Sequence, residues 1–301
     1  MENFIRISAY GYREVGIKQY ESSEIGVKVI NFSDGCRSVV LDPQPGLHNF
    51  NQISYISVDF RIIDAHKDLV LLALIKEAID ALVRESNHSP APVNVFLPYI
   101  PDARADRRFE QGGSHNLKVV ASFINSMGFS KVTVLDPHSD VVEGLINNVS
   151  VLKQNHGVRW VMGQIRQALG SDFVLCAPDL GAAKKIEEVA KDLNVDYVQA
   201  IKIRDVQTGR IVKSELLPKE VSTKSVLIVD DICDGGATFV GIAEALRERG
   251  FEKIALYVSH GIFSKGLGVF EGHIDHIYTG NLVGSYVTSQ EVSLYPFRRA
   301  K

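Results

Sequence analysis

An apolar run in the last third of the chain is followed at once by acidic and small residues. The run is Val226–Val229, and the residues after it include Asp230, Asp231, Asp234, Gly235, Gly236, Ala237 and Thr238. Glycines let backbone N–H groups approach a phosphate closely, and the positive N-terminus of a following helix attracts it further. Adjacent carboxylates repel phosphate but suit sugar hydroxyls or a Mg²⁺ ion beside it. The segment therefore predicts a ribose-phosphate site, with a buried strand, an acidic turn and a helix N-cap as the alternative.

Two other predicted strands also end in charged side chains. Asp136-Pro137-His138 follows the strand predicted at residues 132–135, and Asp106 lies among three arginines after residues 93–97. A carboxylate together with an imidazole suits a Mg²⁺–nucleotide complex. One guanidinium group binds two phosphate oxygens at once, in bidentate fashion. The alternatives are an Asp-Pro turn and a solvated charged loop.

Two further segments carry candidate ligands. Asp179 follows the strand predicted at residues 173–177. Its carboxylate is expected either to bind the sugar or Mg²⁺, or to cap the N-terminus of the next helix. Lys202 and Arg204 alternate with apolar residues, so they share one face of an edge-like strand. This pattern predicts either a mobile flap that carries two cations or a hairpin that faces solvent.

Strands that alternate with helices must position these residues. Apolar runs predict buried strands at 93–97, 132–135, 173–177, 226–229 and 254–258. Helical periodicity is clear at Asp68–Arg84, Asn116–Met127, Ala182–Leu193 and Thr238–Arg249. The pattern predicts an α/β protein of two similar domains, 1–147 and 148–301, each a mainly parallel sheet flanked by helices. A stretch near Val292–Phe297 is expected to return to the first domain.

Composition excludes several classes of function. The 301 residues carry a net charge of −3, which implies no attraction to nucleic acid or to a membrane surface. No stretch approaches the ~18 apolar residues of a membrane helix. The three cysteines are scattered and lack the spacing of a metal site or a disulfide framework. Together with the absence of a predicted signal peptide, this favours a reducing cytoplasm. We interpret Cys233 as a small core residue because no paired histidine is indicated.

Six segments follow one another in an order that is itself informative. They are Phe32–Gly35, Arg104–Arg107, Asp136–His138, Pro178–Gly181, Lys202–Arg204 and Asp230–Asp234. The last is shared with phosphoribosyltransferases generally, but the ordered set resembles the ribose-phosphate diphosphokinases, or PRPP synthetases, over nearly the whole chain. The resemblance implies two tandem type I phosphoribosyltransferase-like domains. It also implies a homo-oligomer, a dimer or hexamer, with shared nucleotide sites.

The resemblance assigns the nucleotide side of the reaction to the first domain. ATP, as co-substrate, would contact Arg104, Asp106 and His138, while a neighbouring subunit supplies Phe32 and Asp34 to the adenine pocket. His138 would also serve catalysis.

The acceptor side is assigned to the second domain in the same way. Mg²⁺ would be held by His138 and Asp179, and Lys202 and Arg204 would form the catalytic flap. The ribose hydroxyls would fall to Asp230 and Asp231, and the sugar phosphate to the segment Asp234–Thr238.

The chain departs from the family pattern at four positions. Cys36 stands where the family has Glu, and Ala105 where it has Gln, beside the expected nucleotide. The family's D-T-G-G-T phosphate loop reads Asp234-Gly235-Gly236-Ala237-Thr238 here, so a threonine and the second glycine are replaced. The departures therefore lie where the base of ATP and the 5′ end of the acceptor are expected.

The resemblance implies transfer of a diphosphoryl group from Mg·ATP to the 1-hydroxyl of a ribose, with release of AMP. Ribose 5-phosphate is the default acceptor, and a related branch from phage NAD-restoring pathways uses ADP-ribose. The altered phosphate loop favours the larger acceptor. A phosphoribosyltransferase and a catalytically silent regulatory subunit are the alternatives.

Overall fold

The chain forms two compact units, Met1–Leu152 and Lys153–Lys301, in a computed structural model. The structure describes residues 4–15, 17–42, 52–86, 89–204, 211–287 and 293–294. For residues 12–15, 17–21, 202–204, 211–213 and 293–294 it describes the backbone alone. The division between the units follows Leu152, whereas the sequence predicted it at 147.

The described part of the first unit contains a seven-stranded sheet in the order β3-β2-β1-β4-β5-β6-β7. Its strands are β1 (Ile5–Val15), β2 (Ile17–Asn31), β3 (Arg37–Asp42), β4 (Gln52–Phe60), β5 (Val93–Phe96), β6 (Lys131–Leu135) and β7 (Val149–Leu152). Strands β1 to β4 pair antiparallel, and β4 to β7 pair parallel.

In the described part of this unit, three helices connect the parallel strands. They are α1 (Ala65–Glu85), α2 (Asn116–Ser126) and α3 (Val141–Leu145). The chain moves in one direction from β4 to β7, so right-handed crossovers place these helices on the same face of the sheet. Their buried side chains share one core with those of the sheet.

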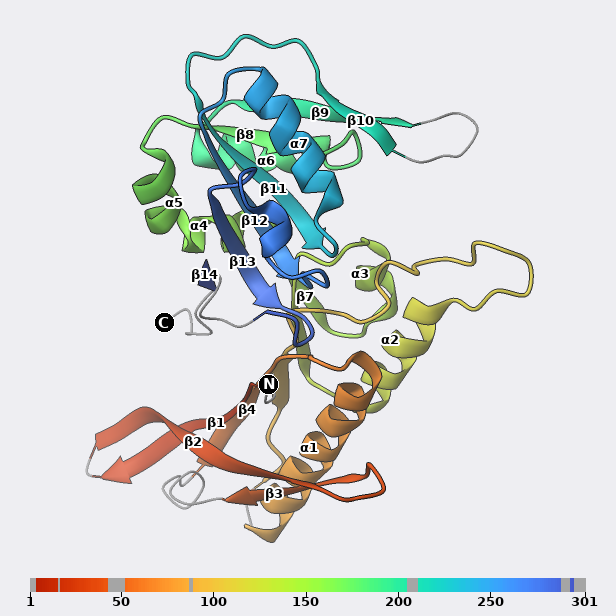
Figure 1. Ribbon diagram of the computed structural model, residues 1–301. Coiled ribbons are helices and arrows are strands. Elements are labelled where there is room, and N and C mark those ends of the chain that lie inside the picture. The colour runs from red at the N-terminus through yellow and green to blue at the C-terminus, as the bar shows by residue number, and fades with distance from the viewer. Residues whose placement is uncertain are drawn as a thin grey trace. The chain divides into compact units, whose positions relative to one another are not determined.

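The described part of the second unit contains a sheet in the order β10-β9-β8-β11-β12-β13-β14 (Figure 1). Its strands are β8 (Val174–Ala177), β9 (Tyr197–Arg204), β10 (Ile211–Leu216), β11 (Ser225–Cys233), β12 (Lys253–Gly261), β13 (His276–Leu282) and β14 (Ser293–Leu294). The helices are α4 (Gln154–Trp160), α5 (Met162–Leu169), α6 (Ala183–Leu193), α7 (Ala237–Glu248) and the short 3₁₀ helix η1 (Gly268–Phe270). Only β9 and β10 pair antiparallel among these described strands.

The direction of winding reverses between β8 and β11. From β8 the chain passes through α6 to β9 on one side, and from β11 it passes through α7 to β12 on the other. The two helices therefore cover opposite faces of the sheet. Val226 and Ile228 pack in the core under α7, whereas Leu227 and Val229 pack in the core under α6. This confirms the prediction that the apolar run is a strand buried on both faces.

Each strand and helix predicted from the sequence is present, and the α/β fold class is confirmed. One boundary differs in an informative way, because β11 continues through the acidic residues to Cys233. The stretch near Val292–Phe297 was expected to return to the first domain. Its described residues, Ser293–Leu294, pair parallel with Tyr278 and Thr279 of β13. No helix in the described ranges has the length and apolar character needed to cross a membrane.

A buried carboxylate ties the β2–β3 hairpin to the first helix. Asp68 is 1% exposed and accepts a 2.8 Å hydrogen bond from Arg37 at the start of β3. Its other oxygen accepts hydrogen bonds of 2.8 Å from the backbone N–H groups of Ile63 and Asp64, ahead of α1. The interaction therefore fixes the hairpin, whose tip carries Phe32 and Asp34.

Replacing Asp68 with alanine should lower the free energy of unfolding by about 3–5 kcal/mol, because a charged partner and two N–H groups lose their acceptor. The matched control is Asp80→Ala on the same helix. Asp80 is 42% exposed and pairs with Lys76 at 2.6 Å, an i,i+4 contact that contributes about 0.3–0.5 kcal/mol. Urea unfolding followed by far-ultraviolet circular dichroism measures both losses, and equal losses would contradict the anchoring role of Asp68.

Candidate functional site

The acids of β11 extend beyond the neighbouring strand. The pairing of β11 with β8 ends at Ile228 and Cys176, whereas its pairing with β12 continues to Cys233 and Gly261. Asp230 and Asp231 are half-buried and lie past the end of β8, at the point where the winding reverses. Ligands of open α/β sheets bind in the crevice at such a point.

A tight turn joins β11 to α7. Gly236 has φ +81°, and a Cβ atom there would lie 2.7 Å from the ring of Phe270, so both the backbone angle and the packing require glycine. The carbonyl of Gly236 accepts hydrogen bonds from the N–H groups of Phe239 (2.9 Å) and Val240 (3.1 Å) in the first turn of α7. The positive end of α7 therefore begins at this loop, as an anion site needs.

A second loop, after β12, is bonded to the first. The N–H of Ile262 donates to the carbonyl of Cys233 at 2.8 Å, and that of Ser264 donates to the carbonyl of Asp234 at 3.2 Å. The Ser264 hydroxyl donates to Asp234 Oδ1 at 2.5 Å. Asp234, which the sequence assigned to the sugar phosphate, is thus also a residue that joins the two loops.

Asp179 lies in the loop after β8, and β8 is the strand next to β11 in the sheet. Its Oδ1 accepts a 3.0 Å hydrogen bond from the N–H of Ala182, just before α6. This bond orders the turn before α6, but the N-cap residue is Ala182, so Asp179 is not the N-cap that the sequence offered as an alternative. A carboxylate has further lone pairs, so the bond does not prevent Asp179 from contacting a ligand.

Lys202 and Arg204 lie on a two-stranded arm formed by β9 and β10. Strand β9 pairs with β8 only as far as Gln199, and from Ala200 to Arg204 it pairs with β10. The edge strand is therefore β10, and β9 is internal at its start. The side chains of Lys202 and Arg204 lie outside the described residues, so their flap role stays a prediction.

Two predicted segments of the first unit meet at the ends of adjacent strands. Asp106, in the loop after β5, accepts a 2.7 Å hydrogen bond from Ser139, which follows His138 after β6. Arg107 donates to Asp106 at 2.8 Å, and the pKa of that carboxyl falls to about 2 because of the bonds from Arg107 and Ser139. Arg104 and His138 are exposed beside this cluster.

Asp136, by contrast, is buried, with a backbone φ of +34°. Its N–H donates to the carbonyl of Leu152 at 2.8 Å. Such strain in a residue other than glycine is typical of functional loops.

The hairpin residues predicted for the adenine pocket lie at the tip of β2–β3. Phe32 is 53% exposed there. Asp34 Oδ1 accepts a 2.9 Å hydrogen bond from the N–H of Cys36, which lowers the pKa of Asp34. The tip is thus an ordered turn that presents an aromatic ring to its surroundings, and its contribution to a neighbouring subunit stays a prediction.

The described residues include no group of three or more His, Cys, Asp or Glu side chains placed to hold a metal ion. Magnesium ions are commonly bound by one or two carboxylates together with substrate phosphates, a mode that the Asp179 carboxylate suits, and the metal roles of His138 and Asp179 stay predictions. Burial raises the pKa of the Cys233 thiol to about 12, and the charges of Asp230 and Asp234 add to the shift. Cys233 is therefore a core residue, as predicted, and not a nucleophile.

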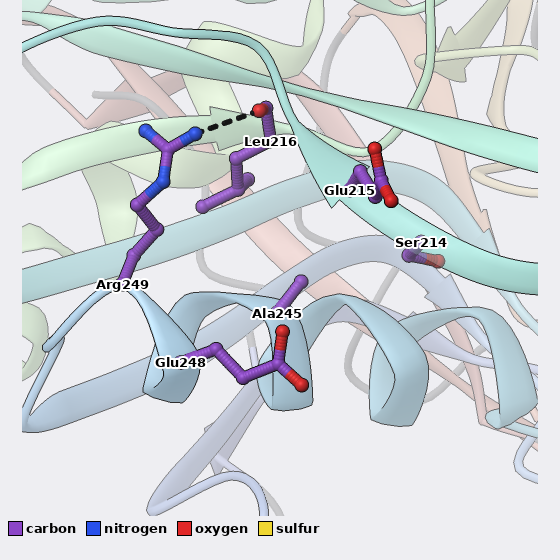
Figure 2. A pocket seen from close by; sticks show the side chains of 6 residues that line it. All are labelled: Ser214, Glu215, Leu216, Ala245, Glu248 and Arg249. Carbon is purple, nitrogen blue, oxygen red and sulfur yellow. Dashed lines mark hydrogen bonds between the residues drawn. The ribbon is translucent and has the colours of Figure 1, made fainter.

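A cavity of about 260 Å³ lies at the other end of α7 (Figure 2). Arg249 donates to the carbonyl of Leu216 at 2.9 Å beside it, and the carboxylates of Glu215 and Glu248 line it. The negative end of the helix and two carboxylates disfavour an anionic ligand there. The N-terminal end of α7 is the better candidate for a phosphate site.

Sequence reasoning missed three residues of these loops. The sequence analysis gave no role to Ser139, Ser264 and Lys265, although Ser139 follows β6 and the other two follow β12, and both strands were predicted. Ser139 and Ser264 act through contacts with residues 33 and 30 positions earlier in the chain, which no local pattern reveals.

Comparison with known proteins points to one family. A family model described as the phosphoribosyl transferase domain matches residues 150–268. The ribose-phosphate pyrophosphokinase of Mycoplasmopsis pulmonis is 30% identical over 230 residues, which cover 73% of this chain and 69% of that protein. The enzyme of the same name from Mycoplasma pneumoniae is 31% identical over 214 residues, which cover 68% of this chain and 63% of that protein.

A solved structure shows the same fold. The phosphoribosylpyrophosphate synthetase of Mycobacterium smegmatis superposes with a TM-score of 0.65 at 20% identity. The match covers 90% of this chain and 86% of that one.

The lowered pKa of Asp106 can be tested directly. Because Arg107 is the largest cause, Arg107→Ala should raise this pKa from about 2 toward the ordinary value of about 3.9. A carboxyl with a lowered pKa stabilises the fold above its ordinary pKa. That contribution is lost as the pH falls from about 4 to about 2. Carbon-detected NMR titration of the aspartate carboxyls measures the midpoint. The control, Arg108→Ala, should leave it near 2; a midpoint that Arg107→Ala does not move would refute the assignment.

Proposed function

Because this chain belongs to the ribose-phosphate pyrophosphokinase family, we propose that it transfers the β,γ-diphosphoryl group of Mg·ATP to the 1-hydroxyl of a 5-substituted ribose and releases AMP. The observation that supports the proposal is that β9, β8 and β11 are parallel neighbours in one sheet, so their carboxyl ends share one edge. The paired acids lie at the end of β11 and Asp179 follows β8, while Lys202 and Arg204 belong to the last residues of β9. Acids suit ribose hydroxyls, while cations suit a transferring diphosphoryl group.

The reaction needs little covalent chemistry from the protein. The oxygen of the acceptor's 1-hydroxyl forms a bond to the β-phosphorus of ATP. The bond from that phosphorus to the oxygen bridging it to the α-phosphorus breaks, and AMP leaves. The hydroxyl proton passes to solvent, because a hemiacetal hydroxyl is more acidic than an ordinary alcohol. Positioning and fixed cations then supply most of the rate.

Named residues have separate roles in this proposal. Asp230 and Asp231 accept hydrogen bonds from the ribose hydroxyls and orient the 1-hydroxyl. Lys202 and Arg204 stabilise the charge that develops on the transferring phosphate oxygens. Arg104 and His138 of the first unit contact ATP. His138 and Asp179 are the residues that would hold Mg²⁺, which would supply neutralisation of charge on the ATP phosphates.

The phosphate loop favours ADP-ribose as an acceptor. The loop lacks the threonine side chain at position 235 and has a methyl group at exposed Ala237, the first residue of α7. A terminal phosphate dianion loses a hydroxyl donor there, a loss of about 1.5–3 kcal/mol. The diphosphate diester of ADP-ribose carries less charge per phosphorus and depends less on that donor. We therefore propose that ADP-ribose is accepted alongside, and in preference to, ribose 5-phosphate.

The test is AMP release by the purified full chain with Mg·ATP and each acceptor in turn, with product masses measured. We expect acceptor-dependent AMP, a product heavier by one diphosphate, and a higher kcat/KM for ADP-ribose. Lys202→Ala should lower kcat about 10²–10³-fold with little change in the KM for ATP, because a charge donor to the transition state is lost.

Other outcomes separate the alternatives. Turnover of ribose 5-phosphate alone would leave the diphosphokinase and exclude the ADP-ribose preference. Diphosphate release from phosphoribosyl diphosphate with a nucleobase would indicate a phosphoribosyltransferase. A folded protein that releases no AMP with either acceptor would be a silent regulatory subunit, and the proposal would be wrong.

A further inference from the structure

The side chain of Lys265 lies over Gly235 in the phosphate loop. A Cβ atom built on Gly235 would lie 3.5 Å from Cε of Lys265, 3.6 Å from Cδ and 3.9 Å from Cγ. The aliphatic stem thus runs along the space next to residue 235, and Nζ is bonded to the atom that lies nearest. The Cβ of a threonine at 235 would thus lie in van der Waals contact with the lysine stem, and its γ atoms would extend from there.

The backbone that carries Lys265 is firmly placed. The N–H groups of Ile262 and Phe263 donate to the carbonyl of Cys233, and the Gly266 N–H donates to the carbonyl of Phe263 at 2.8 Å, which closes a turn around Lys265. Phe263 has φ +50°, an unfavourable angle for a bulky residue, and its ring is fully buried.

The ring of Phe263 fits because Gly261 has no Cβ, which would otherwise lie 2.1 Å from it. Packing therefore holds the turn in its strained form and keeps Lys265 at the phosphate loop.

The negative charge of the acids near this loop would repel an anionic ligand unless a cation offsets it. Asp230, Asp231 and Asp234 place three carboxylates within five residues of one another, next to the expected position of an anionic ligand. The N–H groups of α7 supply only partial positive charge, and Gly235 supplies no side-chain donor. A lysine ammonium carries a full charge and three donors on a flexible stem.

We propose that Lys265 binds the phosphate oxygens of the acceptor's 5′ substituent at this site. The inference rests on the proposed function, because that function places the 5′ end at this loop. The exchange of threonine for Gly235 then replaces a neutral hydroxyl donor with a cation from the adjacent loop. The ligand class is a phosphate or diphosphate ester of a ribose.

The test compares three variants of the full chain by calorimetric binding without ATP. The ligands are ribose 5-phosphate, ADP-ribose and unphosphorylated ribose. Lys265→Met keeps the stem and removes the charge, and should raise the Kd for both phosphorylated ligands about ten- to a hundredfold. Lys265→Arg keeps the charge and should retain most of the affinity. Lys224→Met is the control, because Lys224 precedes β11 at the opposite end of the strand and pairs with Glu252.

A second set of variants tests the shared space. Gly235→Thr alone should weaken binding, because the threonine meets the lysine stem. In a Lys265→Ala background the same change should strengthen binding, because the hydroxyl then has room to donate. The two changes should therefore be strongly non-additive. Additive effects would overturn the inference.

The outcomes distinguish this inference from the proposed function. AMP release with an unchanged Kd in Lys265→Met would overturn the role of Lys265 and leave the function intact. A raised Kd in a protein that releases no AMP would support Lys265 and refute the function. Equal loss for ribose and its phosphate esters would show a packing effect and overturn the inference, as would a native chain that binds neither ester.

Discussion

The reversal of winding between β8 and β11 is the constraint on which the site depends. Right-handed crossovers that leave two neighbouring strands in opposite directions place α6 and α7 on opposite faces of the sheet. No connection then crosses the carboxyl ends of these strands. Among the described strands, β11 pairs only with β12 beyond Ile228, and β9 continues with β10 as an arm beyond Gln199. This topological feature leaves the end of β11, with its acids, beside the end of β8 and the start of the β9–β10 arm.

A second constraint is the density of like charge that this crevice gathers. Carboxylates suited to ribose hydroxyls stand close to where phosphate is expected, and their repulsion must be offset. The start of α7 contributes partial charge, and the loop after β12 is bonded to Cys233 and Asp234. Close packing of Phe263 and Phe270 against two glycines keeps these loops fixed. Electrostatic preorganisation of this kind is usually the largest contribution that an enzyme makes to its rate.

The central strands of the second unit and helices α6 and α7 could be predicted, because these strands are buried on both faces, whereas α4, α5 and β13 were not predicted. Runs such as residues 226–229 and 254–258 have no polar positions, and helices such as α6 repeat their apolar residues at the helical period. The antiparallel half of the first sheet was not predicted. Its first strands include residues such as Ser8, Glu24 and Lys28 between apolar ones, so each strand alone gives a weak signal.

The site was predictable as a set of segments but not as a set of contacts. Strand ends placed Asp106 and His138 near one another, because β5 and β6 are consecutive. The Ser139 bond to Asp106, and the position of Lys265 over Gly235, depend on how loops distant in sequence pack. The local pattern at Asp179 led to an expected N-cap, whereas its carboxylate bonds to Ala182 in the turn before the helix.

The proposed acceptor site lies beside the acids at the end of β11. Amide hydrogen exchange of the full chain, with and without a saturating phosphorylated ribose, tests this placement most directly. We expect ligand-dependent slowing of exchange at residues 230–238 and 262–266, and no change around the cavity at Glu248 and Arg249. Slowing confined to that cavity or to the β2–β3 hairpin, with none in the phosphate loop, would contradict the account.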